Sequence, residues 1–552
     1  MKAGLHGPHM GDRMNEEKEA KLHQLIRLIA NGSTTAEAAE MLQLTGRTAR
    51  RWLKEGAPSG KKKAPKAPPI NKNLVRKPGY SKFAEPVDTT LVGWRRFVIS
   101  SIQNDVPIDK DFLAALRFYC KRRKAKLILI PVDYCLNAHS VWPVDELELY
   151  RSNVSLSKHL KLMAAMPVSP TIVEPLAGLA SLSKGSSMII GHPQICKEGM
   201  ASYGTAPAEM HTTGSISRPQ KAYSHTKTGE KAKINHSLAA LVVELGQGDS
   251  HFVRVLNGDK SSGFFDCGRG DEGYYSKDGF AKLRGGDVEV MVTGDEHAAQ
   301  ADPLFVEVTY TRKDSMSEVM RPKRHVRHDL LDFMFQNHHD MADNLRRVAK
   351  HLSGVDRVED ELVLTSNHLR KTKKPWAEDI IVSSNHDEAF YKWLTTVNIK
   401  NDVLNAKLYF KMNWLMLDNL ETNSNGGQFP NPFKLWMEHS EHAGLLKTTR
   451  FLGSNESYRV CGVEFGLHGH HGANGARGSL KGFAAMPFKV SVGHGHTSGI
   501  NKGAQMGGHG TKGMAYMKGA SSWTQTNGFL YKNGTRQQTT IINGEWRGPA
   551  LT

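Results

Sequence analysis

The sequence predicts an α/β (α+β) protein with more than one domain. Its 552 residues exceed what one ordinary hydrophobic core holds together, so we expect two or three domains. A helical pattern at Lys110 to Lys124 leads into the apolar run Lys126 to Val132, which is typical of one helix-and-strand unit. Several later apolar runs are short and end directly in polar residues, as strands do where they leave a sheet.

Composition and charge restrict the class of protein further. Hydrophobic residues make up 39% of the chain, and no apolar run reaches the roughly 18 residues of a membrane span, so we expect a globular protein and no membrane partner. The first residues contain no apolar leader and the five cysteines form no CxxC pair, so we expect a cytoplasmic location without a disulfide framework. The net charge of +18 favours a polyanionic partner such as nucleic acid.

Residues 1–56 are predicted to form a helix-turn-helix domain. Helical patterns cover residues 15–30, 35–42 and 47–55, with a break of about four residues before the third. Residues 1–77 contain 16 Lys or Arg against 7 Asp or Glu, hence a net +9. The side chains expected to contact DNA or RNA are Thr45, Arg47, Thr48 and Arg51, while Leu44, Ala49 and Trp52 pack inward. A basic helical hairpin that binds a protein partner is the alternative.

Residues 57–82 are rich in proline and lysine and are predicted to be a linker. Lys61, Lys62 and Lys63 are candidate contacts to phosphates, and a solvated spacer is the alternative.

Residues 83–286 are predicted to be an α/β middle region without an assigned role. Further strands are expected at 170–174, 188–191, 237–247 and 251–256. Residues 185–231 are rich in Gly, Ser, Thr and Lys, which indicates an exposed or nucleic-acid-facing loop.

Five polar motifs follow in order after residue 287, each behind a short apolar run. They are Asp295-x-His297, Asp329, Asn385-His386-Asp387, His468-Gly469 and His494-x-His496. Carboxylate and imidazole two residues apart can both reach one metal ion where the chain leaves a sheet. A single such motif is common by chance, whereas five in order are specific.

This ordered set resembles the calcineurin-like metallophosphoesterase superfamily over residues 288–546. The resemblance implies that residues 287–552 form a catalytic domain, a four-layer sandwich of two mixed sheets flanked by helices. Two positions depart from the family pattern, because His328 and Ser384 stand where glycine is usual or common.

The resemblance also implies two sets of metal ligands. One metal would be held by Asp295, His297, Asp329 and His496, and the second by Asp329, Asn385, His468 and His494. Carboxylate, amide and imidazole ligands without a thiolate suit Mn²⁺ first, with Zn²⁺, Fe or Ni²⁺ as alternatives. Asp332 is expected to matter much less than the bridging Asp329.

The same resemblance makes His386 the residue that protonates the leaving oxygen or steadies the transition state, with Asp387 or Glu388 orienting it. Arg477 and Lys481 are candidate phosphate contacts. Three histidines in glycine-rich loops are interpreted as nonligands, namely His470, His471 and His509. His338 and His339 either border the substrate cleft or lie on an exposed helix face.

Charge and motifs together predict a metal-dependent DNase. The tail, the basic N-terminal extension and the size are similar to those of the pre-early DNA-transfer nucleases of T5-like phages, which implies degradation of host DNA in the host cytoplasm. Large phosphoesterase nucleases often assemble, so we expect a homo-oligomer. The alternatives are a phosphatase or small-molecule phosphodiesterase, and a nonenzymatic DNA-binding regulator or scaffold.

Overall fold

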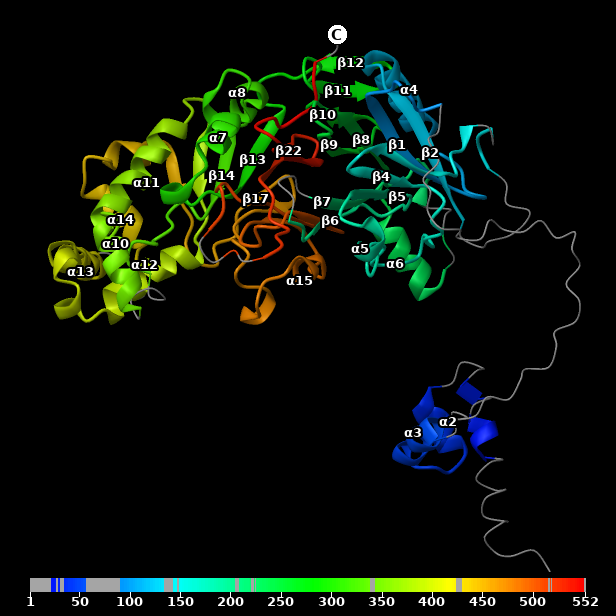
Figure 1. The fold of residues 1–552 in the computed structure, drawn as a ribbon, viewed down its shortest axis with the longest axis horizontal. Coiled ribbons are helices and arrows are strands. Elements are labelled where there is room, and N and C mark those ends of the chain that lie inside the picture. The colour runs from blue at the N-terminus through cyan, green and yellow to red at the C-terminus, as the bar shows by residue number, and fades with distance from the viewer. Residues whose placement is uncertain are drawn as a thin grey trace, which may run out of the picture. The chain divides into compact units, whose positions relative to one another are not determined.

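The computed structural model divides the chain into two units, Met1–Phe83 and Ala84–Thr552. It describes residues 21–25, 28–29, 34–55, 90–133, 142–145, 148–203, 208–219, 223, 225–337, 343–422, 429–514, 517 and 519–550 (Figure 1). Among these residues, no helix combines the length and the apolar character that crossing a bilayer requires.

The described part of the first unit contains two short helices joined by a turn, and residues 21–25 and 28–29 are helical as well. Helix α2 (Thr35–Met41) begins with a capping box, in which Thr34 and Glu37 bond to each other's backbone N–H groups. The turn passes through Gln43, which has a left-handed backbone, into α3 (Gly46–Glu55). Ala38, Ala39 and Ala49 are buried in a small core that Leu44 and Leu53 complete. Most of the predicted 15–30 helix and all of Lys61, Lys62 and Lys63 lie outside the described residues.

The second unit is a mixed α/β structure in which two large sheets carry the predicted motifs (Figure 1). The six-stranded sheet has the order β16 (Thr449–Phe451), β15 (Glu378–Ile381), β14 (Arg324–His328), β13 (Val288–Asp295), β22 (Thr526–Tyr531) and β23 (Arg536–Thr540). Strands β13 to β16 run parallel, and β22 runs antiparallel to β13. The carboxyl ends of four consecutive strands therefore meet at one edge.

The ten-stranded sheet joins segments from both halves of the second unit. Its order is β17 (Arg459–Val460), β18 (Val463–Glu464), β19 (Lys489–Val492), β21 (Ala504–Met506), β20 (Gly499–Asn501), β6 (Cys196–Met200), β7 (Ala208–Thr212), β5 (Ser187–Ile190), β4 (Leu160–Met163) and β3 (Asn153–Ser157). Because β20 pairs with β6, the expected boundary between residues 286 and 287 runs through one continuous sheet. An apolar core from both large sheets includes Val290 and Ile380 of the six-stranded sheet and Val463 of the ten-stranded sheet.

Two smaller sheets complete the strands. The four-stranded sheet has the order β2 (Lys126–Val132), β1 (Arg96–Gln103), β8 (Ala239–Leu245) and β9 (His251–Asn257), and the three-stranded sheet consists of β10 (Phe264–Asp266), β11 (Gly273–Ser276) and β12 (Gly279–Lys282). Helix α4 (Lys110–Arg123) packs on β1 and β2 through Phe112 and Leu116, so the predicted helix-and-strand unit is present.

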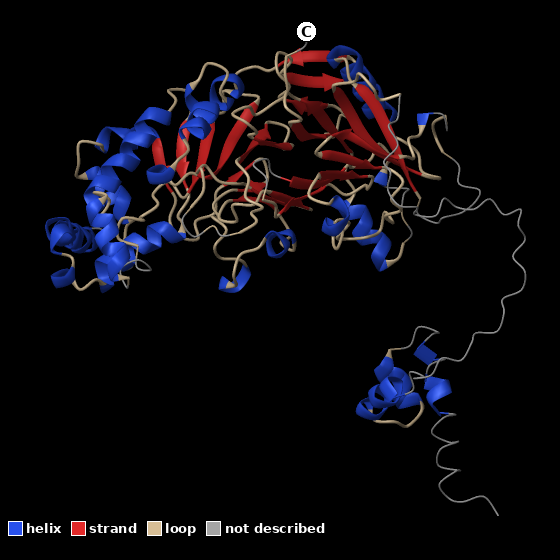
Figure 2. Cartoon of the chain, viewed as in Figure 1, coloured by secondary structure: helices blue, strands red, loops and turns tan. Residues whose placement is uncertain are grey.

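The remaining helices are distributed over the second unit. They are α5 (Ala180–Ser183), α6 (Lys227–Asn235), α7 (Pro303–Val306), α8 (Met316–Met320), α10 (Asn344–Leu352), α11 (Val358–Thr372), α12 (Asn385–Thr396), α13 (Ala406–Thr422), α14 (Pro432–Glu438) and α15 (Leu480–Ala484). Helices α10 to α14 gather at one end of the unit, beyond the strands (Figure 2). Phe390, Trp393 and Met412 pack there with Phe433 in a helical core.

Two predictions for the middle region are wrong. Residues 170–174 form turns rather than a strand. The segment 185–231, expected to be an exposed loop, contains the buried strands β5, β6 and β7. Its polar residues face one another inside the protein: Lys197 Nζ lies 2.8 Å from Glu209 Oε1, for example. The prediction is wrong because it rests on composition. Polar side chains that pair inside a core have the same composition as polar side chains exposed to solvent.

Candidate metal centre

The predicted ligands lie where parallel strands end. Asp295 is the last residue of β13, Asp329 follows β14, and Asn385 begins α12 shortly after β15. His468 comes after β18, and both His494 and His496 come directly after β19. Each strand therefore delivers one of the five motifs to a common edge of the sheets.

The first predicted set converges closely. The ligand atoms of Asp295, His297, Asp329 and His496 all lie within 4.8 Å of one another, and all four residues are buried. His496 Nε2 lies 3.1 Å from Asp295 Oδ2 and 3.2 Å from His297 Nε2. His297 Nε2 lies 3.8 Å from Asp329 Oδ2.

Members of the second predicted set approach the same oxygen of Asp329. Asp329 Oδ2 lies 3.3 Å from His468 Nε2, which lies 3.1 Å from Asn385 Oδ1. The rings of His468 and His494 contact at a centroid distance of 5.2 Å. Asp329 thus lies between the two sets, as a bridging carboxylate must.

The backbone is strained at these positions. His297, Asp329, His494 and His496 have φ angles of 45°, 42°, 67° and 52°, in the left-handed region that non-glycine residues rarely adopt. Each such residue costs of order 1–3 kcal/mol and persists only where the surroundings enforce it. Such strain is typical of functional sites.

Gly493 allows the approach of two motifs. The His494 backbone N–H donates to Asp295 Oδ1 at 2.9 Å. A Cβ on Gly493 would lie 2.2 Å from that oxygen and 2.8 Å from His328 Cβ, which is far inside contact distance. Only glycine therefore fits between these strands.

Several buried polar atoms at the centre have no partner within the described chain. They are Asp295 Oδ2, Asp329 Oδ1 and His328 Nε2. His496 lies near Asp295 Oδ2 but not in hydrogen-bond geometry. A carboxylate oxygen left without a partner in a core costs several kcal/mol unless a cation binds it. The donor set therefore fits divalent metal ions.

The pKa shifts at the centre also indicate that its carboxylates require positive charge. Burial favours neutral carboxyl groups, yet the imidazoles of His468 and His386 outweigh this effect and hold the pKa of Asp329 well below its usual range. Burial likewise favours a neutral His468, but the Asp329 and Asp295 carboxylates raise its pKa to about 9. In this arrangement protons supply the positive charge that the two aspartates need, and metal ions can replace them.

His386 and Asp387 occupy different surroundings. His386 Nδ1 hydrogen-bonds the Asp332 carbonyl oxygen, and its Nε2 lies 3.7 Å from Asp329 Oδ2. Although burial favours the neutral ring, the charges of Asp329 and Asp332 raise the pKa of His386. Asp387 accepts from the Ser384 N–H at 3.0 Å as part of the α12 capping box. Its described hydrogen bonds are thus with the helix start and with Asn431.

The sequence interpretation gave too little weight to Asp332 and His328. Asp332 Oδ1 lies 3.1 Å from His297 Nδ1, and Gln300 donates to Asp332 Oδ2 at 2.6 Å. Asp332 therefore contacts a predicted ligand, an interaction that the sequence interpretation did not include. His328 is fully buried, with its Nδ1 3.4 Å from that of His468.

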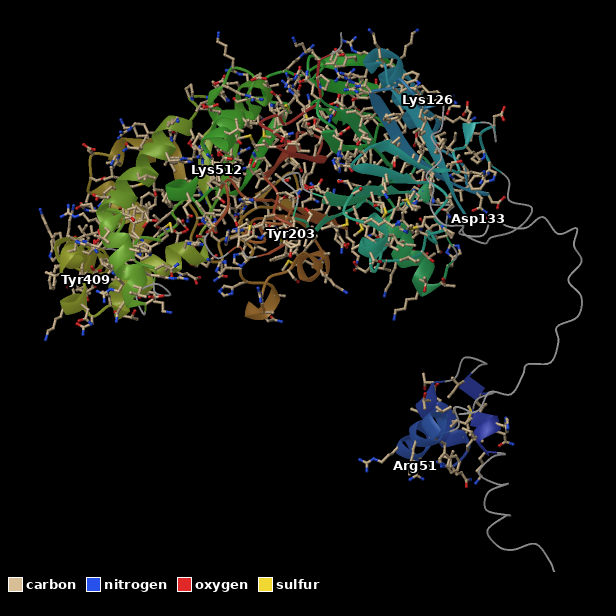
Figure 3. The ribbon with its side chains drawn as sticks, viewed as in Figure 1. Arg51, Lys126, Asp133, Tyr203, Tyr409 and Lys512 are labelled. Atoms are coloured by element: carbon tan, nitrogen blue, oxygen red, sulfur yellow. The ribbon has the colours of Figure 1, made fainter. Side chains whose placement is uncertain are left out.

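The predicted nucleic-acid contacts lie on the surface where they are described. Arg51 is exposed (Figure 3), as is Arg47. Thr48 is half-buried, and its hydroxyl lies 2.7 Å from that of Thr45 in a hydrogen bond. Arg477 is exposed on the loop after β18 and pairs with His471 through a backbone bridge. His338 and His339 lie outside the described residues.

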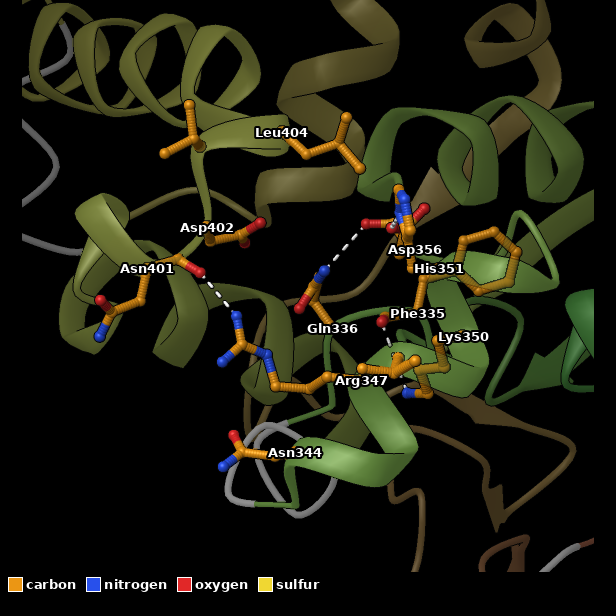
Figure 4. A pocket seen from close by; sticks show the side chains of 12 residues that line it. Phe335, Gln336, Asn344, Arg347, Lys350, His351, Asp356, Asn401, Asp402 and Leu404 are labelled. Carbon is orange, nitrogen blue, oxygen red and sulfur yellow. Dashed lines mark hydrogen bonds and ion pairs between the residues drawn. The ribbon is translucent and has the colours of Figure 1, made fainter.

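A large pocket lies in the helical end and not at the metal centre. It measures about 510 Å³ and is lined by residues of α10 and of the segments 335–336 and 401–404 (Figure 4). Arg347 donates to the Asn401 carbonyl at 2.7 Å and Gln336 to the Asp356 carbonyl at 2.8 Å. None of the predicted ligands lines it, so we assign the chemistry to the buried centre.

Comparison with known proteins gives one extensive match. The chain is 31% identical over 525 residues to Protein A1 of Escherichia phage T5, and the match covers 90% of each protein. No protein-family model matches the chain. Among solved structures, Vps29 of Chaetomium thermophilum matches 34% of this chain and 95% of its own, at 12% identity and a TM-score of 0.19. A score of that size does not establish a shared fold.

Proposed function

Because the chain belongs to the family of Protein A1 of Escherichia phage T5, we propose that it is a phage protein that hydrolyses DNA phosphodiester bonds with divalent metal ions. The observation that carries this proposal is the convergence of five separate motifs on Asp295 and Asp329. The motif order and the facing mixed sheets support a metallophosphoesterase core, and the proposed biological role is degradation of host DNA.

We assign Asp295, His297, Asp329 and His496 to one ion and Asp329, Asn385, His468 and His494 to the other. Mn²⁺ is the proposed ion, because carboxylate, amide and imidazole ligands suit it. When bound, such a pair of ions supplies an activated water and positive charge at the phosphate.

The other residues of the centre orient groups and move protons. His386, whose Nδ1 is fixed on the Asp332 carbonyl, directs Nε2 toward the site. Its raised pKa keeps a proton available at that atom, as a general acid for the leaving oxygen requires. The Asp332 carboxylate accepts a hydrogen bond from His297 Nδ1–H and so holds the ring in place. His297 Nε2 can then bind the metal ion.

The basic N-terminal unit supports a polymeric substrate. Arg47 and Arg51 are exposed on α3, the second helix of a helix-turn-helix arrangement, where they are proposed to contact phosphates. The strongly basic segment 57–82 would extend this contact along DNA. Homo-oligomer formation is part of the proposal, since each copy would add another basic unit.

The proposal is tested by incubating the purified protein with circular and linear DNA. EDTA should stop cleavage, and Mn²⁺ should restore it more strongly than Zn²⁺, Ni²⁺ or Fe²⁺. Asp329→Ala should abolish cleavage and lower bound metal, because it removes a ligand from both sets. Full cleavage by Asp329→Ala would refute the dimetal assignment.

His386→Ala separates proton transfer from metal binding. We expect near-normal metal content and a loss of kcat on the order of 10²–10⁴-fold. A small chromogenic phosphodiester and a phosphomonoester, assayed in parallel, distinguish a nuclease from a phosphatase. Cleavage of the monoester alone, with intact DNA, would favour the phosphatase.

A further inference from the structure

Three more potential ligands converge beside the candidate metal centre. Glu388 on α12 and the adjacent His470 and His471, in the loop after β18, each offer one ligand atom within 4.8 Å of the others. Glu388 Oε1 lies 3.2 Å from His470 Nε2 and 3.9 Å from His471 Nε2. These three residues, which we call the outer cluster, belong to neither of the proposed ligand sets.

Hydrogen bonds within the fold do not account for the two histidines. His470 bonds Glu388 through Nε2, but its Nδ1 is buried and has no partner in the described part of the chain. The rings of His470 and His471 lie only 4.1 Å apart between centroids. Two imidazoles and one carboxylate thus face one another, as the ligands of a single divalent cation do.

The loop that carries the histidines is held in a fixed shape. The Gly478 N–H donates to the His470 carbonyl at 3.1 Å, and the Gly472 N–H donates to the Ala476 carbonyl at 2.7 Å. A ligand pair on such a closed loop loses little conformational freedom when it binds an ion. The Glu388 and His471 side chains are about half exposed, so an ion reaches them directly from solvent.

We propose that the outer cluster binds a third divalent cation of the borderline class, represented by Zn²⁺. Two imidazoles and one carboxylate form a known type of Zn²⁺ site that leaves a coordination position open. The Irving–Williams order places Zn²⁺ and Ni²⁺ above Mn²⁺ at such a nitrogen-rich site. The outer cluster thus differs in metal preference from the more oxygen-rich centre beside it.

An ion at this place links two segments of the metal centre. Glu388 follows Asn385 by three residues on α12, and His470 follows His468 by two. The His468 and His470 rings contact at a centroid distance of 5.4 Å. Zn²⁺ in the outer cluster would therefore fix the start of α12 against the loop after β18, independently of any catalysed reaction.

The test is equilibrium dialysis of the metal-stripped full chain against Zn²⁺, with bound metal measured by mass spectrometry. The variants are Glu388→Gln, which preserves the shape of the side chain, and His471→Asn, which alters a half-exposed ring. His159→Asn is the matched control, because His159 is exposed and lies outside the cluster. Circular dichroism confirms that each variant is folded.

Wild type and His159→Asn are expected to bind one more equivalent of Zn²⁺ than Glu388→Gln and His471→Asn. Asp329→Ala should keep this equivalent, since Asp329 is not in the outer cluster, while losing metal elsewhere. Equal Zn²⁺ binding by wild type and both cluster variants would overturn the third site. Retention of the cluster equivalent together with full DNA cleavage by Asp329→Ala would refute only the dimetal assignment and not the outer cluster.

Discussion

Some residues of the proposed metal centre matter for the space they leave or the ring they orient, and not as metal ligands. Gly493 and Asp332 illustrate this point, because neither is a proposed ligand. Gly493 lets the His494 backbone reach Asp295, and Asp332 fixes the ring of His297. Changing either residue leaves every proposed ligand in the chain, so the effects report on geometry alone.

Gly493→Ala is expected to remove metal binding and DNA cleavage together. The new Cβ would overlap Asp295 Oδ1 and His328, so the β19 end must move away from β13. The measurements are metal content and cleavage rate. Gly503→Ala is the control, since its Cβ meets neighbours no closer than 3.5 Å. If Gly493→Ala binds metal as Gly503→Ala does, the close approach is not required.

Asp332→Asn is expected to weaken metal binding by about 10–100-fold, the usual effect of losing a partner that orients a ligand histidine. Asparagine keeps the size of the side chain but accepts less strongly from His297 Nδ1. Metal titration of the variant measures the effect, with Asp314→Asn as a control, because the Asp314 side chain is about half exposed and contacts no proposed ligand. Unchanged affinity in Asp332→Asn would restore the sequence-based view that Asp332 matters little.

At the scale of helices and strands, the sequence predicted those elements whose patterns are local. Helix α4 and strands β2 and β9 match their predicted ranges closely, because apolar periodicity is read within one element. The predicted ligands at strand ends are brought together as well. The contact between Asp332 and His297, in contrast, depends on two strands meeting, and no local pattern encodes it.

The buried strands of the middle region contain histidines that make stability depend on pH. Burial lowers the pKa of His192, beside β5, and of His251, at the start of β9, to about 4 each. Between pH 4 and about 6.5 the unfolded chain therefore binds more protons than the folded chain. The free energy of unfolding therefore has its full value above about pH 6.5 and decreases as the pH falls toward 4. Each histidine accounts for a decrease on the order of 3 kcal/mol.

Urea unfolding of the chain at a series of pH values between about 4.5 and 7 measures this dependence. The double variant His192→Gln and His251→Gln should show a smaller slope of stability against pH than wild type, whatever its absolute stability. Identical slopes in the two proteins would mean that these histidines do not titrate on unfolding.

At the scale of the whole molecule, we expect the second unit to carry out hydrolysis and the first unit to contribute to DNA binding. Every proposed metal ligand lies in Ala84–Thr552, while the first 83 residues carry a large share of the positive charge. A chain restricted to residues 84–552 should hydrolyse a small chromogenic phosphodiester at the wild-type rate. Its affinity for long DNA should fall, and the salt dependence should flatten by about 0.9 in slope for each DNA phosphate that the shortened chain no longer neutralises.

Nitrocellulose binding of labelled DNA over a range of salt concentrations measures this effect. Full-length Arg47→Ala and Arg51→Ala serve as matched variants, because they test α3 without removing the unit. Broadly weaker binding across sequences indicates phosphate contact, whereas weaker binding at particular base pairs indicates base reading. DNA binding by the shortened chain that equals wild type at every salt concentration would assign the first unit to a protein partner.

The pairing of β6 with β20 also governs the order in which the protein can form during synthesis. Strand β6 cannot pair with β20 until residues 499–501 have been synthesised. Strand β13 likewise pairs with β22, which lies more than 200 residues later in the chain. Contacts of such large sequence separation form slowly, because the loop between them must close first. The ribosome must release most of the chain before His494 and His496 can meet Asp295. The proposed metal centre therefore forms only late in synthesis, and until then the unpaired edge of β6 is open to other chains or to chaperones.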